Sequence, residues 1–134
     1  MNGLESFPEE KTIESLSSDV EVTTVSATFE DMTDIVLTVP SGFGGSYLCM
    51  FNAVIEFTQA NKEGAIIINV NDSHVADTER IFSSIGADLK SVISVIRNLL
   101  NLNGGDIVKM KFKTDGATLK ILKYTFIIMR TSGV

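Results

Sequence analysis

From Val20 onward, the chain consists of short runs rich in Val, Ile, Thr and Phe that are separated by clusters of Gly, Asn, Asp and Ser. Runs of this kind are typical of β-strands, and the intervening clusters are typical of turns. Apolar and polar residues alternate most clearly at 108–113, where Val108, Met110 and Phe112 alternate with three lysines. About eight such runs, with frequent turns between them, predict an all-β jelly-roll sandwich of antiparallel strands.

The predicted strands lie at residues 20–28, 34–39, 47–57, 65–70, 108–113 and 117–130, with a weaker strand at 77–85. Residues 61–64, Asn-Lys-Glu-Gly, predict a hairpin between two of these strands. Because side chains alternate along a strand, Leu119 and Ile121 are expected on the opposite face of the final strand from Phe126 and Ile128.

Residues 85–102 fit two kinds of structure. The apolar residues of this segment follow the spacing of three, four and seven that is typical of an amphipathic helix. They are Ile85, Leu89, Val92, Ile93, Ile96, Leu99 and Leu100. The β-branched residues at 92–96 favour a strand instead. The pattern alone therefore leaves both structures open.

Several predicted strands are apolar on both faces. Leu48, Met50 and Val54 lie opposite an alternating apolar set that begins at Tyr47. A single sandwich buries only one face of each sheet, so the second apolar face needs another layer, which a second copy of the chain can supply. We therefore expect an oligomer, although scattered apolar residues on the surface of a monomer are the alternative.

The 134 residues suffice for one globular domain, and their acidity is concentrated at the N-terminus. Residues 1–34 carry nine acids and one lysine, whereas residues 35–134 carry eight acids and ten bases. We interpret residues 1–19 as an acidic arm and residues 20–134 as the head domain. The arm is either a chain end without a role or an anchor that orders against a partner, with four apolar residues available for docking. These are Leu4, Phe7, Ile13 and Leu16.

Few residues in the chain are suited to catalysis or metal binding. Cys49 is the only cysteine and His74 the only histidine, so the chain cannot form an intrachain disulfide, a His-rich metal site or most nucleophilic constellations. Asp72, His74 and Asp77 are too few to complete a zinc or calcium site with motif spacing. We expect no enzyme activity, no cofactor and no metal.

Charge and hydropathy limit the classes of partner. A formal charge of -6 argues against binding to nucleic acid, and no run of apolar residues is long enough to insert into a membrane. The start of the chain, Met-Asn-Gly-Leu-Glu, has acids where an export signal has basic residues. Lys109, Lys111 and Lys113, with Lys120 and Lys123, are either a basic strip for an anionic partner or glycan, or a solvated outer face.

Four segments resemble the tumour necrosis factor and complement globular-head superfamily. Residues 100–108, Leu-Asn-Leu-Asn-Gly-Gly-Asp-Ile-Val, and residues 124–128, Tyr-Thr-Phe-Ile-Ile, are similar to the C-terminal half of that fold. Residues 42–51, Gly-Phe-Gly-Gly-Ser-Tyr-Leu-Cys-Met-Phe, resemble its central strand, and residues 68–71 resemble the next strand and turn. The resemblance covers about residues 20–134; each motif is short, but their order and spacing agree.

The resemblance implies a jelly roll of up to about ten strands, with a strand before Gly105, that assembles as a homotrimer. The implied trimer contacts are apolar and aromatic residues of the central and final strands. They are Tyr47, Phe51, Tyr124, Phe126 and Ile128. The absence of an export signal, together with the acidic arm, is more similar to bacteriophage virion proteins than to exported cytokines.

We therefore predict a structural protein on the virion surface, assembled in the host cytoplasm. Its expected role is capsid decoration or a head fibre, with the arm docked on a capsid or other virion protein. The alternative is a tip domain of a phage fibre, or of another trimeric adhesin, that binds a receptor or a host-surface glycan.

Overall fold

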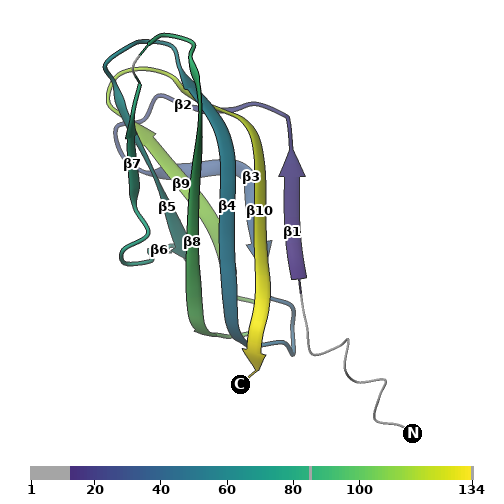
Figure 1. The fold of residues 1–134 in the computed structure, drawn as a ribbon. Helices are drawn as coiled ribbons and strands as arrows, with labels where there is room; N and C mark the ends of the chain where they lie inside the picture. Colours follow the sequence, from purple (N-terminus) through teal and green to yellow (C-terminus); the bar gives the residue numbers. More distant parts are fainter. Residues whose placement is uncertain (1–12, 85, 134) are drawn as a thin grey trace, which may run out of the picture.

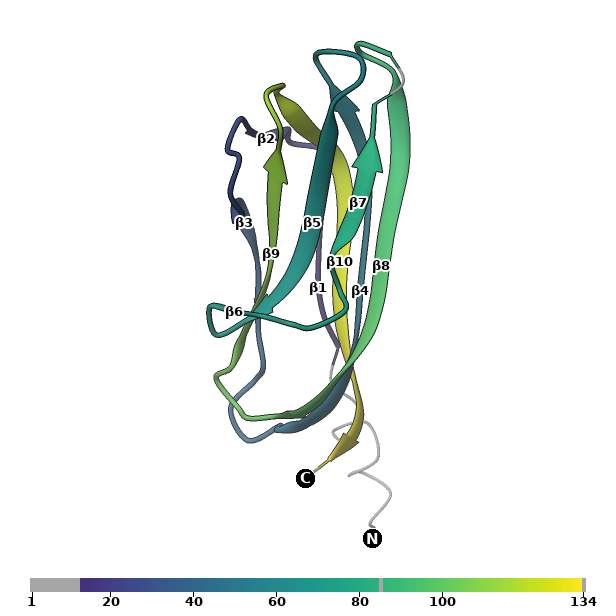
Figure 2. The ribbon, with the colours of Figure 1, turned by 90° about the vertical axis from the view of Figure 1, so that its left-hand side faces the viewer.

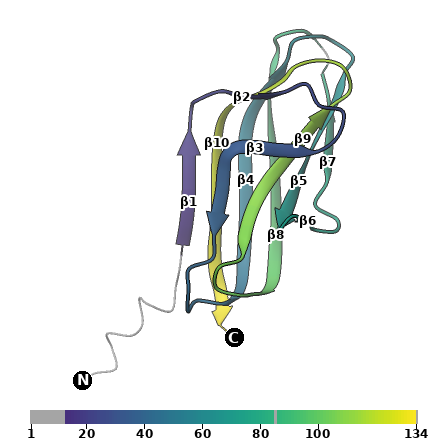
Figure 3. The ribbon, with the colours of Figure 1, turned by 180° about the vertical axis from the view of Figure 1, so that it is seen from behind.

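In a computed structural model of the chain, the described residues, 13–84 and 86–133, form two antiparallel β-sheets that pack face to face (Figure 1). Sheet A contains β1 (Ile13–Ser18), β2 (Val22–Thr24), β4 (Gly45–Phe57), β8 (Lys90–Leu102) and β10 (Leu119–Gly133). Sheet B contains β3 (Glu30–Thr38), β5 (Glu63–Val70), β6 (Ser73–His74), β7 (Arg80–Ser83) and β9 (Ile107–Thr114). In Figure 2, β3 and β9 of sheet B lie on one side and β4, β8 and β10 of sheet A on the other, and Figure 3 shows sheet B from outside. The predicted all-β sandwich is confirmed.

The order of the strands is that of a jelly roll. In sheet A, β1 and β2 both pair with β10, which is followed by β4 and β8. In sheet B the order is β3, β9, β5, and both β6 and β7 pair with β5. The pairings are nested along the chain, because the first strands pair with the last, β3 with β9, β4 with β8, and β5 with β6 and β7. A long antiparallel ribbon that rolls up into two sheets has this nested pairing.

The core lies between the sheets and contains the inward side chains of both. In β4, every second residue from Tyr47 to Phe57 is buried, as the alternation in the sequence predicts. These side chains meet Met110 and Phe112 of β9 and Phe126 of β10, all of them fully buried. Each large apolar side chain buried in this way stabilises the fold by about 1.5–3 kcal/mol.

The segment whose pattern fitted both helix and strand forms β8 from Lys90 to Leu102. Its inward residues include Val95 and Leu99, whereas Val92 and Ile96 point out of the sandwich. The apolar residues of the two faces together produce the helix-like spacing. The strand implied by the family resemblance is therefore confirmed for residues 90–102.

Two sequence predictions about connections and faces are wrong. Residues 61–64 do not form a hairpin, because β4 belongs to sheet A and β5 to sheet B, so this connection crosses from one sheet to the other. In β10, the register shifts between Ile121 and Lys123, at a bulge that adds one residue. As a result Ile121 and Phe126 both face the core, although simple alternation places them on opposite faces.

Candidate interaction surfaces

The side chains predicted as trimer contacts lie mainly inside the sandwich. Tyr47, Phe51, Phe126 and Ile128 have no exposed surface, because they fill the space between the sheets. Tyr124 is partly buried and stacks on Phe51, with 6.3 Å between the ring centroids. The structure corrects the assignment: the aromatic faces of β4 and β10 form the core of one chain, so contacts between copies need other side chains.

Part of the segment predicted to be an acidic arm belongs to the sandwich. Residues 13–18 form β1, which pairs with β10 from Ile13 opposite Met129 to Ser18 opposite Tyr124. The side chain of Leu16 packs against the core, whereas Ile13 points outward and is 58% exposed. Two of the predicted docking residues thus belong to the sandwich. The other two, Leu4 and Phe7, lie outside the described residues.

The lysines of β9 are paired with acids on the outer face of sheet B. The Lys109 ammonium lies 2.9 Å from the Asp72 carboxylate and 3.2 Å from that of Asp31. Lys111 lies 3.3 Å from the other oxygen of Asp31, and Lys113 lies 3.9 Å from Glu79.

These contacts shift the pKa of two groups. Hydrogen bonds to Asp72 and Asp31 raise the pKa of Lys109 above its ordinary value. Partial burial disfavours the charged form of Asp31, but the hydrogen bonds and charges of Lys109 and Lys111 outweigh it, so the pKa of Asp31 is lowered. The strip therefore has little free positive charge for an anionic partner. Lys120 and Lys123 are not part of it, because β10 belongs to sheet A.

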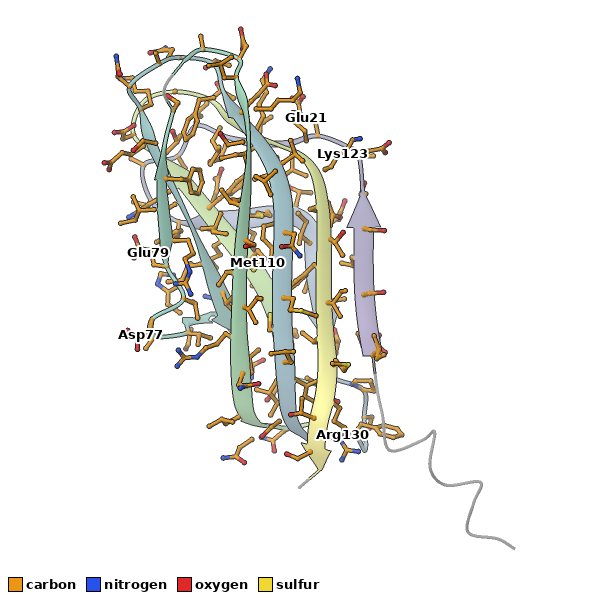
Figure 4. All side chains as sticks on the ribbon, viewed as in Figure 1. Glu21, Asp77, Glu79, Met110, Lys123 and Arg130 are labelled. Carbon is orange, nitrogen blue, oxygen red and sulfur yellow. The ribbon has the colours of Figure 1, made fainter. Side chains whose placement is uncertain are left out.

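The region around His74, in β6 and the residues beside it, is held by packing contacts and an ion pair. His74 lies edge-on to Phe29 at 5.3 Å between the ring centroids, and the Lys113 ammonium lies 4.6 Å from the centre of the same Phe29 ring. Asp72 pairs with Lys109, while Asp77 stands out at the edge of the molecule (Figure 4). Within residues 13–84 and 86–133, no three His, Cys, Asp or Glu side chains are grouped so that they could hold a metal ion.

The lone cysteine lies in the core. Cys49 has no exposed surface, and burial raises the pKa of its thiol to about 12. A thiol with so high a pKa stays protonated and is a poor nucleophile. Its position fits a packing role among the inward residues of β4.

The outer face of sheet A, which points toward the viewer in Figures 1 and 4, is apolar over much of its area. Exposed or half-buried apolar side chains project from the six-residue β1 and from the three long strands β4, β8 and β10. They are Ile13 of β1, Leu48, Met50 and Val54 of β4, Val92, Ile96 and Leu100 of β8, and Ile127 and Met129 of β10. In the sequence, Leu48, Met50 and Val54 indicate this face, whereas the predicted trimer contacts lie on the opposite face.

None of the described residues forms a helix long and apolar enough to cross a membrane. The chain matches no protein-family model, and no curated protein sequence is similar to it.

Several solved structures share the fold at very low sequence identity. A chain in the structure of infectious bursal disease virus, Gx strain, superposes with a TM-score of 0.55 and 7% identity, covering 92% of this chain and 37% of that chain. The insecticidal delta-endotoxin Cry8Ea1 of Bacillus thuringiensis gives a TM-score of 0.51 at 11% identity, covering 81% of this chain and 19% of the toxin. Dimeric latent PorU of Porphyromonas gingivalis gives 0.51 at 9% identity, covering 90% of this chain and 13% of PorU.

The chain therefore spans less than two fifths of each of these proteins. Identities of 7–11% show a shared fold and do not transfer an activity. The chain is a jelly-roll sandwich similar to domains found in a virus, in an insecticidal toxin and in PorU.

Proposed function

We propose that the chain is a structural protein of a virus particle, a homotrimer on the surface of a bacteriophage virion. The observation that carries the proposal is the match of nearly the whole sandwich to a chain of infectious bursal disease virus. The proposal is also supported by the described charged and nucleophilic groups, which are engaged in contacts within the chain or buried. The lysines of β9 are paired with acids, and the thiol of Cys49 is buried. Such an arrangement suits a building block better than a catalyst.

Attachment to the particle is assigned to the residues that precede β1. Because Ile13 and Leu16 belong to sheet A, the apolar anchors left for docking are Leu4 and Phe7, which three acids accompany at positions 5, 9 and 10. A segment this short cannot form a core, so ordering it needs a surface outside its own length. Three such segments on one trimer bind cooperatively when the geometry allows all three to engage.

The alternative role, a tip domain that binds a glycan, has less support. Protein sites for sugars commonly offer an aromatic ring to the ligand. Phe29 lies near the outer face of sheet B, but its ring already contacts His74 and Lys113. We therefore retain the structural role as the proposed function.

The test is to purify virus particles by density-gradient centrifugation from cells that produce the protein, and to quantify the bound chain by immunoblot. Wild-type protein should migrate with the particles. The double variant Leu4→Ala/Phe7→Ala should lose at least about tenfold of the bound protein, because three weakened contacts act together. The matched control, Ser6→Ala, should bind like the wild type.

Two outcomes contradict different parts of the proposal. Wild-type protein found only in the particle-free fractions contradicts the virion role. A double variant that stays on the particles at wild-type levels contradicts docking through Leu4 and Phe7, and assigns attachment to the head.

A further inference from the structure

We infer that the outer face of sheet A is the surface through which copies of this chain contact one another. The inference rests on the proposed function, of which the homotrimer is a part. It assigns the contacts between copies to a defined set of exposed residues and no longer to the buried aromatic residues.

The strand register aligns the apolar side chains in rows across the sheet. Ile127 of β10 is opposite Met50 of β4, which is opposite Ile96 of β8. The next row contains Ile13 of β1, opposite Met129, which is opposite Leu48. Neighbouring strands are only about 4.8 Å apart, so each row is an apolar band over three of the four strands, and it ends at Ser15 of β1 in the first row and at Asn98 of β8 in the second.

A hollow interrupts the apolar surface and gives it a shape that a partner can fill. Thr125, Asn52 and Ser94 form the next row, and beyond them Val54 and Val92 are opposite each other. The hollow beside this polar row has a volume of about 500 Å³, and its lining includes Asn52, Val54, Val92 and Thr125. Side chains of a second copy can enter it, where they would meet apolar groups together with Asp19 and Lys123.

The area of the face is close to what one copy contributes to a standard interface, and in a cyclic trimer this area is divided between two neighbours. β4 and β8 are each 13 residues long. Three strands about 44 Å long and the six-residue β1, about 20 Å long, lie about 4.8 Å apart and give a face of about 700 Å². A standard protein–protein interface takes about 800 Å² from each partner.

The charges of the face are confined to one end, near Lys123 in Figure 4. There the carboxylate of Glu56 lies 3.6 Å from the Lys90 ammonium and 3.9 Å from the Lys120 ammonium. These three charged groups therefore form ion pairs within one chain. The rows from Ile13 to Ile96 contain no charged side chain. A charge-free centre with charges at its rim is typical of contacts between identical subunits, whose cores are more apolar than those of transient complexes.

A second copy fits this face better than a virion protein does. A virion partner is met only at assembly, and until then an apolar face of this size favours aggregation. Copies of the chain are present together from synthesis onward. In a cyclic trimer the contact is heterologous, so the β8 half of the face, with Ile96, would meet the β1 and β10 half of the next copy, with Ile13.

The experiment measures the mass of the full chain in solution by light scattering coupled to gel filtration. The variants Ile96→Glu and Ile13→Glu each place a carboxylate on one half of the face, at positions that are 58% exposed in the single chain. The matched control is Ile81→Glu on β7 of sheet B, where Ile81 is 65% exposed. Since all three positions are exposed, each variant should keep the circular dichroism spectrum of the wild type.

The wild type and Ile81→Glu should elute with about three times the chain mass of 14.5 kDa, and the two face variants with about one chain mass. A wild type that is oligomeric, with face variants of unchanged mass, overturns the assignment of the face and leaves the proposed function standing. A wild type of one chain mass at micromolar concentration overturns both the face and the homotrimer.

Discussion

A substitution of Leu16 tests whether residues 13–18 are a docking arm or a strand of the sandwich. The sequence pattern assigns Leu16 to the arm, but in the structure its side chain packs against the core. It lies opposite Phe126 on the inward side of β1. If the strand is part of the fold, then Leu16→Ala removes apolar contacts from the core and destabilises the isolated protein. If residues 13–18 belong to a free arm, then the same change leaves stability unaltered.

The size of the effect follows from the burial of the side chain. Leu→Ala at a fully buried position costs about 2–5 kcal/mol. Leu16 is only partly buried and lies at the edge of the sheet, where neighbours can relax, so we expect a loss of about 1.5 kcal/mol. For a domain of this size, that loss lowers Tm by about 4–8 °C.

The assay is thermal unfolding followed by circular dichroism at one fixed protein concentration, because association makes Tm depend on concentration. Ser15→Ala is the control, since Ser15 lies on the same strand but is exposed, and it should change stability by less than about 0.5 kcal/mol. A Leu16→Ala variant that melts with the wild type would refute the placement of β1 on the core.

Three further predictions concern the fold and its charges. Cys49 should not react with a thiol reagent in the native protein and should react once urea unfolds it, because burial raises the pKa of the thiol to about 12. Asp31→Asn should reduce stability at neutral pH by up to about 1 kcal/mol, as measured by urea unfolding. The pKa of Asp31 is lowered from 3.8 in the folded state. The difference in stability between the variant and the wild type should therefore be present above pH 3.8 and disappear as the pH falls through the folded pKa. A difference in stability that persists in acid would contradict the contact with Lys109. Gly45→Ala should lower Tm, because the residue has φ of 147° and an added Cβ would collide with the backbone oxygen of Ser132; an unchanged Tm would refute this close approach.

The alternation of apolar residues was sufficient to predict the sandwich and most of its strands. It was insufficient where both faces of a strand are apolar. In β8, Val92 and Ile96 face outward while Val95 and Leu99 face the core, and the two sets together imitate the spacing of a helix. The sequence pattern also did not reveal irregularities of a single residue. An example is the bulge after Ile121, which moves Phe126 to the core face.

The residues predicted as trimer contacts are buried for a related reason. The sequence showed that β4 has two apolar faces, but it did not show which of them the second sheet covers. The face with Tyr47 and Phe51 has the larger side chains and fills the core, which leaves Leu48 and Met50 outside. The strand β1 was missed because only one inward residue, Leu16, is apolar, and backbone pairing with β10 holds the rest of it.

The most direct measurement of the proposed role is a cryo-electron microscopy reconstruction of purified particles that contain the protein. We expect threefold density on the particle surface into which three sandwiches fit, with their sheet A faces directed toward the threefold axis and the start of β1 directed toward the particle. Particles that lack such density, or that carry single sandwiches with sheet A open to solvent, would contradict the homotrimeric virion protein proposed here.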